Sequence, residues 1–130
     1  MNIKFVYFIM VFNFLFLSGC NYNDNSSTVK NGDYYMEVET KSGVPPYVTI
    51  NDNKISFTYD LLSSHLSLGN YSIDGDILTM TTDDSNDIYV FQIDGDNLIF
   101  QKGRSSPIKL KDEEHGVKIT DKAKFHLKDD

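Results

Sequence analysis

The chain has 130 residues, of which 13% are aromatic, and its 19 acidic residues against 12 basic ones give a net charge of −7. This length allows one domain of ordinary size, and 9 Phe and 8 Tyr residues supply enough apolar material for a packed core. The acidic balance argues against a nucleic-acid partner, because few groups are present to neutralise phosphates. The single cysteine excludes an intramolecular disulfide and a zinc site built from cysteines.

Residues 1–19 have the pattern of a secretory signal peptide and are set apart from the fold. Lys4 supplies the positive charge, and the apolar stretch over residues 5–17 is shorter than the about 20 apolar residues that a spanning helix needs. The stretch is followed by Ser18, Gly19 and Cys20, and the small residues Ser18 and Gly19 give a signal peptidase access to the backbone just before Cys20. We therefore predict cleavage between Gly19 and Cys20.

The sequence Leu17-Ser18-Gly19-Cys20 resembles the lipobox of bacterial lipoproteins. The resemblance implies that the Cys20 thiol receives a diacylglyceryl group, whose two acyl chains suffice for stable anchoring. The alternative is an ordinary secretory peptide that leaves a free thiol. Because the mature chain is acidic, anionic headgroups repel it and only the anchor holds it at the membrane. We expect a lipid-anchored protein on the extracellular side of the cell membrane.

Three segments make up the predicted organisation. After the signal peptide, residues 20–32 hold the lipidated cysteine and a polar stretch without periodicity, which predicts a flexible linker. Residues 33–130 form a single β domain, because their apolar residues repeat with a period of two and not 3.6. Turn signals separate the apolar runs at residues 52–53, 74–75, 83–86 and 94–95.

The pattern predicts about eight short strands in an antiparallel meander that closes into a small barrel or a sandwich, lipocalin-like at most in architecture. One helical turn is possible at residues 60–66. Strands are expected before and after the 52–53 turn, and also at residues 33–40, 68–73, 76–82, 87–93 and 97–103, with one or two closing strands within 105–111 and 118–127.

The turns also predict which residues lie opposite one another. Two-residue turns at 74–75 and 94–95, with a four-residue loop at 83–86, bring the large apolar residues onto one face. A barrel filled by side chains of this size leaves little internal cavity. The expected core residues are Tyr71, Ile73, Leu78, Met80, Tyr89, Phe91, Leu98 and Phe100. The expected opposite pairs are Tyr71 with Leu78, Leu78 with Phe91, Met80 with Tyr89, Phe91 with Leu98, Tyr89 with Phe100, Val90 with Ile99, Ile50 with Ile55 and Val48 with Phe57.

The opposite face of this meander is less polar than a solvated face normally is, because Ile77, Ile88, Val90 and Ile99 point there. Two explanations stay open: a later segment of the chain covers these residues, or they form a binding surface. We take the four residues as a candidate interaction face, with a protein of the cell envelope as its partner.

No local motif for catalysis or metal binding is found in the sequence. A calcium loop starting at Asp83 fails at Ile88, where glycine is required, and no Gly-x-Ser-x-Gly motif is present. The three histidines lack the spacing of a zinc site. We predict a non-catalytic binding module without metal or cofactor. The alternatives are a carrier of a small apolar ligand, or an enzyme in which groups such as Asp60 or His65 converge in three dimensions.

Several segments resemble small lipoproteins of Gram-positive bacteria, and also the outer segments of sensor metallopeptidases of the β-lactam-sensor type. This resemblance covers nearly all of residues 33–127 and implies an envelope location and a β fold, while it leaves function open. Peptidase activity does not carry over, because His-Glu-x-x-His is absent. The segments are Pro46-Tyr-Val-Thr-Ile, Phe57-Thr-Tyr-Asp-Leu-Leu-Ser-Ser, Gly69-Asn-Tyr-Ser-Ile, Leu78-Thr-Met-Thr-Thr-Asp-Asp and Tyr89-Val-Phe-Gln-Ile.

Overall fold

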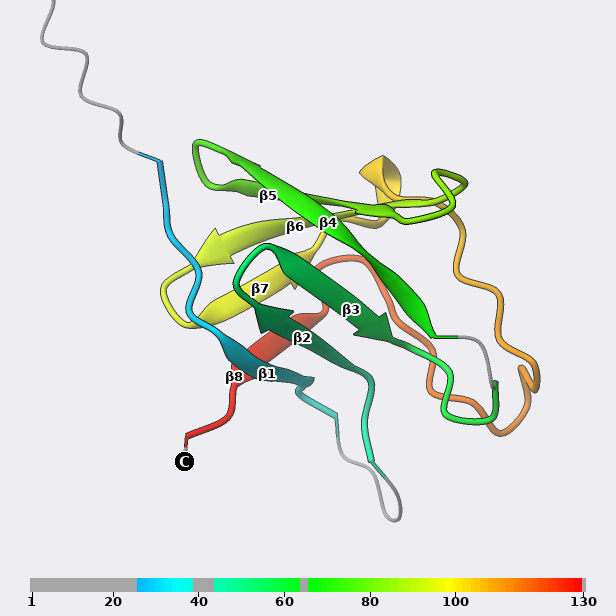
Figure 1. Cartoon of the computed structure of the whole chain (residues 1–130). Coiled ribbons are helices and arrows are strands. Elements are labelled where there is room, and N and C mark those ends of the chain that lie inside the picture. The colour runs from blue at the N-terminus through cyan, green and yellow to red at the C-terminus, as the bar shows by residue number, and fades with distance from the viewer. Residues whose placement is uncertain (1–25, 39–43, 64–65, 130) are drawn as a thin grey trace, which may run out of the picture.

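The computed structural model describes residues 26–38, 44–63 and 66–129, which form a closed eight-stranded antiparallel barrel (Figure 1). Each strand pairs with the next, and the first pairs with the last, so every strand has two partners and no edge of the described sheet is exposed. The all-β meander is confirmed, and the closure is that of a barrel. Its elements are β1 Gly32–Met36, β2 Tyr47–Asn51, β3 Lys54–Thr58, β4 Ser67–Asp74, β5 Ile77–Thr82, β6 Ile88–Asp94, β7 Asn97–Phe100, the short 3-10 helix η1 Lys102–Arg104, and β8 Lys124–Leu127.

The predicted register is confirmed at two of the hairpins. Across the β5–β6 connection Leu78 lies opposite Phe91, as the four-residue loop required. Across the β2–β3 turn Val48 lies opposite Phe57. In both hairpins the paired side chains are buried in the barrel, so the turn chemistry and the hydrophobic pattern specify the same alignment.

The other two hairpins are shifted by two residues from the prediction. Tyr71 lies opposite Met80 and not Leu78, because the turn is formed by Gly75 with the residue after it. A type I′ turn with Asp and Gly as its two central residues would need a positive φ at both of them. Here Gly75 and Gly95 (φ 62° and 58°) are instead the first central residues, and only this first position has a positive φ. Since the shift is even, no side chain changes face. In the β6–β7 hairpin the observed pairs are Phe91 with Phe100, Gln92 with Ile99 and Ile93 with Leu98.

Aromatic side chains fill the barrel interior around Phe57. Its ring centroid lies 5.2 Å from that of Tyr89, 5.5 Å from that of Phe91 and 5.8 Å from that of Phe125, all in edge-to-face contacts. Six of the eight predicted core residues are buried, whereas Tyr71 and Ile73 pack against the core half-buried. The fully buried six are Leu78, Met80, Tyr89, Phe91, Leu98 and Phe100.

The chain departs from the predicted strands after β7. A strand was expected over residues 97–103, but β7 ends at Phe100, and residues 105–111 form no strand. The Ser105 and Ser106 hydroxyls accept the backbone N–H groups of Val90 and Ile88, while the carbonyls of these two residues accept backbone N–H groups, so side chains supply only half of a ladder along β6. Pro107 then has no N–H to continue a ladder. A hydrogen-bonded turn at residues 60–63 occupies part of the segment where a helical turn was expected.

The two ends of the barrel differ in their connections. Two-residue turns join β2 to β3, β4 to β5 and β6 to β7, and we call the end that they share the turn end. The longer connections, including the loop of residues 101–123, lie at the opposite end, which we call the loop end (Figure 1, right). The chain enters at the turn end, where the Ser27 N–H donates to the Gly75 carbonyl at 2.8 Å and Val29 packs against the core.

Candidate functional site

The four residues of the candidate interaction face do not form one exposed surface. Val90 is only 4% exposed, because residues 101–106 lie over it: the Gln101 N–H donates to its carbonyl at 2.9 Å. Ile88 is 44% exposed, whereas Ile77 and Ile99 are half-buried. The expected pairing of Val90 with Ile99 is wrong, since Ile99 lies opposite Gln92. At Val90, therefore, the chain's own later segment provides the cover.

Asp60 is at the loop end, and its carboxylate joins two loops. One oxygen, Oδ1, accepts the Leu62 N–H at 3.0 Å, and Oδ2 accepts the Lys111 N–H at 2.6 Å. The side chain is 9% exposed, and these charge-assisted bonds compensate for its loss of water. Both oxygens thus hold backbone in place. His65, Gly19 and Cys20 lie outside the described residues.

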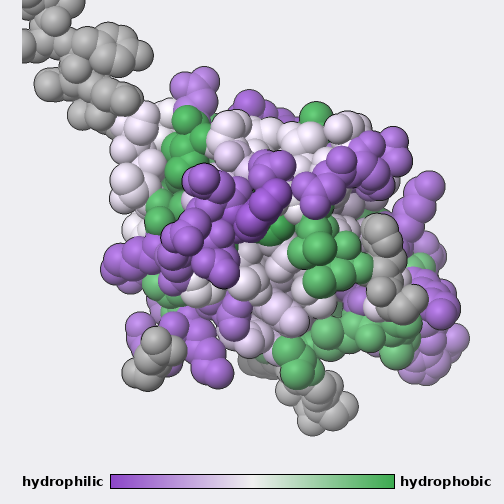
Figure 2. Space-filling view, in the orientation of Figure 1, coloured by the Kyte–Doolittle hydropathy of each residue, from purple (hydrophilic) through white to green (hydrophobic). Residues whose placement is uncertain are grey.

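Exposed apolar side chains gather at the loop end. Figure 2 shows them toward the right and lower right of the view, around the start of β4 and the loop before it. They are between 48% and 57% exposed, and they make up five of the seven exposed large apolar residues in the described part of the chain. Such clustering marks an interaction surface more often than scattered residues do. This apolar rim consists of Val44, Leu61, Leu62, Leu66 and Leu68.

A groove of about 240 Å³ opens within the apolar rim, between the β3–β4 loop and the turn of residues 112–117. Leu61 and Leu62 line one side of it, and His115 and Val117 line the other. The hydrogen bond from His115 Nδ1 to Asp112 Oδ2, 2.9 Å long, lowers the pKa of that carboxyl. An apolar groove beside an acidic turn can accept an apolar side chain that is accompanied by a positive charge.

Sequence reasoning missed this site. The Leu61-Leu62 pair stands in the segment for which the sequence predicts a helical turn, and neither its exposure nor its neighbours across the groove follow from a period of two. The signal that was present is the pair itself, since two adjacent leucines in a polar loop must expose at least one side chain unless the fold covers both. The structure leaves both exposed.

Neither a cluster of metal-ligating side chains nor a membrane-spanning helix is found in the described part of the chain. Its His, Cys, Asp and Glu side chains form no group of three or more that could hold a metal ion. None of its helices is long and apolar enough to cross a membrane. No known protein family, curated protein or solved structure matches the chain. The molecule's own geometry defines its class, a small closed meander barrel with a filled interior and an apolar rim at one end.

Proposed function

We propose that the mature chain is a lipid-anchored lipoprotein at the outer side of the cell membrane, where it acts as a non-catalytic module that binds another protein. The observation that carries this proposal is the apolar rim at the loop end. The barrel is already closed and its core is already filled, so the fold does not need these exposed side chains. Exposing them costs solubility, and a binding partner is the physical reason to retain them.

The filled interior argues against carriage of a ligand inside the barrel. Tyr34, Phe57, Tyr89, Phe91 and Phe125 are at most 2% exposed and occupy the space where such a ligand would sit. Eight-stranded barrels have just enough room for side chains or for one small ligand, and here side chains take it. A binding surface therefore has to lie on the outside of the barrel.

The path of the chain supports one orientation of the rim relative to the membrane. Cys20 precedes Ser26 by six residues, so even fully extended chain spans at most about 20 Å between them. Ser27 is bound at the turn end, beside Gly75. The 8 residues of β4 then separate this end from the rim by about 25 Å. With an anchor on Cys20, we expect the turn end to face the lipid and the rim to face away from it, which favours a protein over a lipid as the partner.

The acidic residues beside the groove argue against a second copy of this chain as the partner. The turn beside the groove carries Asp112, Glu113 and Glu114, and within the described residues neither glutamate forms an ion pair. Two copies docked through their rims would bring these carboxylates together, and like charges at an interface repel. A partner with lysine or arginine beside an apolar side chain complements the surface instead.

Membrane fractionation tests the anchor. Cells that express the Cys20→Ala variant should show a protein without lipid whose signal peptide is uncleaved or aberrantly cleaved, because the acceptor thiol is absent, and any chain that is cleaved should be in the soluble fraction. If the variant is processed normally and stays bound to the membrane, the anchor assignment is wrong.

The binding role is tested by crosslinking in intact cells, followed by isolation of the protein and its partner. Leu62→Asp should abolish recovery of a partner that the wild-type protein captures, because a carboxylate would be buried in the groove. Asn53→Asp introduces the same charge at the turn end and is the matched control. Equal recovery with all three proteins, or a product made only of this chain, would contradict the proposal.

A further inference from the structure

The charges of this chain are unevenly distributed along its length. Residues 26–96 contain 12 acidic and 3 basic residues, whereas residues 97–128 contain 4 acidic and 8 basic ones. The stretch from 97 to 111 has no acidic residue at all. An acidic protein thus has one basic region, and that region includes most of the loop between β7 and β8. The basic residues of the stretch are Lys102, Arg104, Lys109 and Lys111.

A cleft of about 380 Å³ lies within this basic region, between residues 102–110 and residues 113–119. Its volume is in the range of small-molecule sites in proteins. Phe100 and Ile119, both buried members of the core, form an apolar floor together with Ile108. We call it the loop cleft. It is separate from the rim groove, and the two sites share no lining residue.

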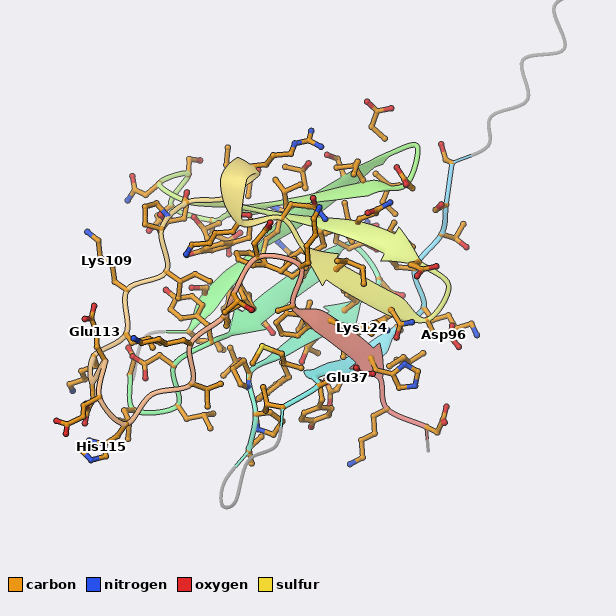
Figure 3. The ribbon with its side chains drawn as sticks, turned by 180° about the vertical axis from the view of Figure 1, so that it is seen from behind. Glu37, Asp96, Lys109, Glu113, His115 and Lys124 are labelled. Carbon is orange, nitrogen blue, oxygen red and sulfur yellow. The ribbon has the colours of Figure 1, made fainter. Side chains whose placement is uncertain are left out.

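Polar groups around the loop cleft are mostly positive or hydrogen-bond donors. Lys102 and Lys118 line it, and within the described residues neither ammonium forms an ion pair. Ser106 Oγ accepts the Ile88 N–H at 2.9 Å and keeps its own proton available for donation. Glu113 is the one acidic residue of the lining. Figure 3 shows Glu113 with Lys109 and His115 at the loop end, far from Asp96 at the turn end.

We propose that the loop cleft binds a small amphipathic anion, with an apolar body on the Phe100 and Ile119 floor and a carboxylate or similar head group near Lys102 and Lys118. At about 30 Å³ of liquid volume per water-sized group, the cleft has room for roughly a dozen heavy atoms. The head group gains charge-assisted hydrogen bonds from ammonium and hydroxyl donors, and the body gains apolar burial. This site is independent of the rim and of the protein partner proposed for it.

Three probes with the same tail and different heads separate charge from apolarity: decanoate, decanol and decylamine. Each is titrated into the chain from residue 20 to residue 130, which contains the whole barrel, with Cys20→Ser to keep it free of lipid. Amide chemical shifts report the position of binding. Decanoate should bind and shift the amides of residues 100–110 and 117–119, decanol should bind more weakly, and decylamine should not bind at this cleft. Equal binding of decylamine, shifts confined to other regions, or no binding of decanoate would overturn the proposal.

Charge variants give two effects of opposite sign. Lys102→Gln and Lys118→Gln should each weaken decanoate binding about fivefold, and the double variant more than tenfold. Glu113→Gln should strengthen it about twofold to fivefold, because a like charge is removed from the lining. Lys54→Gln is the control and should leave affinity unchanged. Lys54 is exposed at the turn end, where its ammonium donates a hydrogen bond to Asn70 Oδ1. Affinity that is the same in all five variants would show that the lysines do not recognise the head group.

Discussion

The turn end and the loop end of this barrel are built by different rules. At the turn end, two-residue connections whose first residue has a positive φ (Asp52, Gly75 and Gly95) fix the strands in register, and acidic side chains such as Asp52 and Asp76 face water. At the loop end, longer connections carry exposed leucines, a groove and a cleft. In this closed barrel, the core and the tight turns are therefore sufficient to specify the fold. The long loops are then free to present binding surfaces, as loops on rigid scaffolds commonly do.

The largest expected effect separates core from rim. Phe57→Ala should destabilise the protein by about 3–5 kcal/mol, because it removes a ring that contacts four other buried rings and leaves a cavity. Phe91→Ala should cost a similar amount. Such losses approach the whole stability of a small domain. Leu61→Ala, in the rim, should stay within about 0.5 kcal/mol of wild type in denaturant unfolding. Similar losses for Phe57 and Leu61 would refute the division between core and rim.

Asp60 tests whether the loop end is held together by one carboxylate. Asp60→Asn should cost about 2–3 kcal/mol, since an amide nitrogen must face one of the two backbone N–H groups that the oxygens now accept. Amide hydrogen exchange at Leu62 and Lys111 should quicken more than exchange in the barrel strands. Asp83→Asn, at an exposed position of the β5–β6 connection, serves as the control. Uniform acceleration across all strands would mean that Asp60 supports the whole fold and not the loops.

A glycine pair tests the turn end. Gly75→Ala should cost about 1–2 kcal/mol, because Gly75 has a φ of 62° and no atom lies within 4 Å of a Cβ placed there, so the cost is backbone strain alone. Gly103 has equally open surroundings without a positive φ, and Gly103→Ala should be neutral. Thermal unfolding of the two variants makes the comparison. Equal melting temperatures would contradict the turn assignment.

Buried tyrosines predict how the core responds to alkali. Burial raises the pKa of Tyr89, and its hydrogen bond with Tyr59 adds to this; burial also raises the pKa of Tyr34. In the unfolded chain both ionise near pH 10, so their contribution is fully present below that pH and is lost above it. Stability should fall by about 1.4 kcal/mol per pH unit for each tyrosine. Tyr89→Phe should reduce this slope. Tyrosinate absorbance that develops fully while the circular dichroism stays native would contradict the prediction.

The sequence predicts the scaffold better than the site, for a physical reason. A period of two determines which side chains face inward. The predicted turn at Gly75 was off by one residue and the predicted register by two, yet Met80 and Leu78 lie on the core face as predicted. The rim and the loop cleft depend on how loops far apart in sequence meet. Asp60 bonding to Lys111 is such a contact, and no local pattern specifies it. For the same reason the cover over Val90 was expected only as one of two alternatives.

Photocrosslinking from defined positions tests the difference between the two ends most directly. A photoreactive residue is placed singly at Leu61, Leu62 or Leu68 in the rim, and at Asn53 or Asp76 at the turn end, in the full chain expressed in cells. We predict crosslinks to another protein from the rim positions and none from the turn end. Crosslinks of equal yield from both ends, or from the turn end alone, would contradict the claim that the loop end is the binding end.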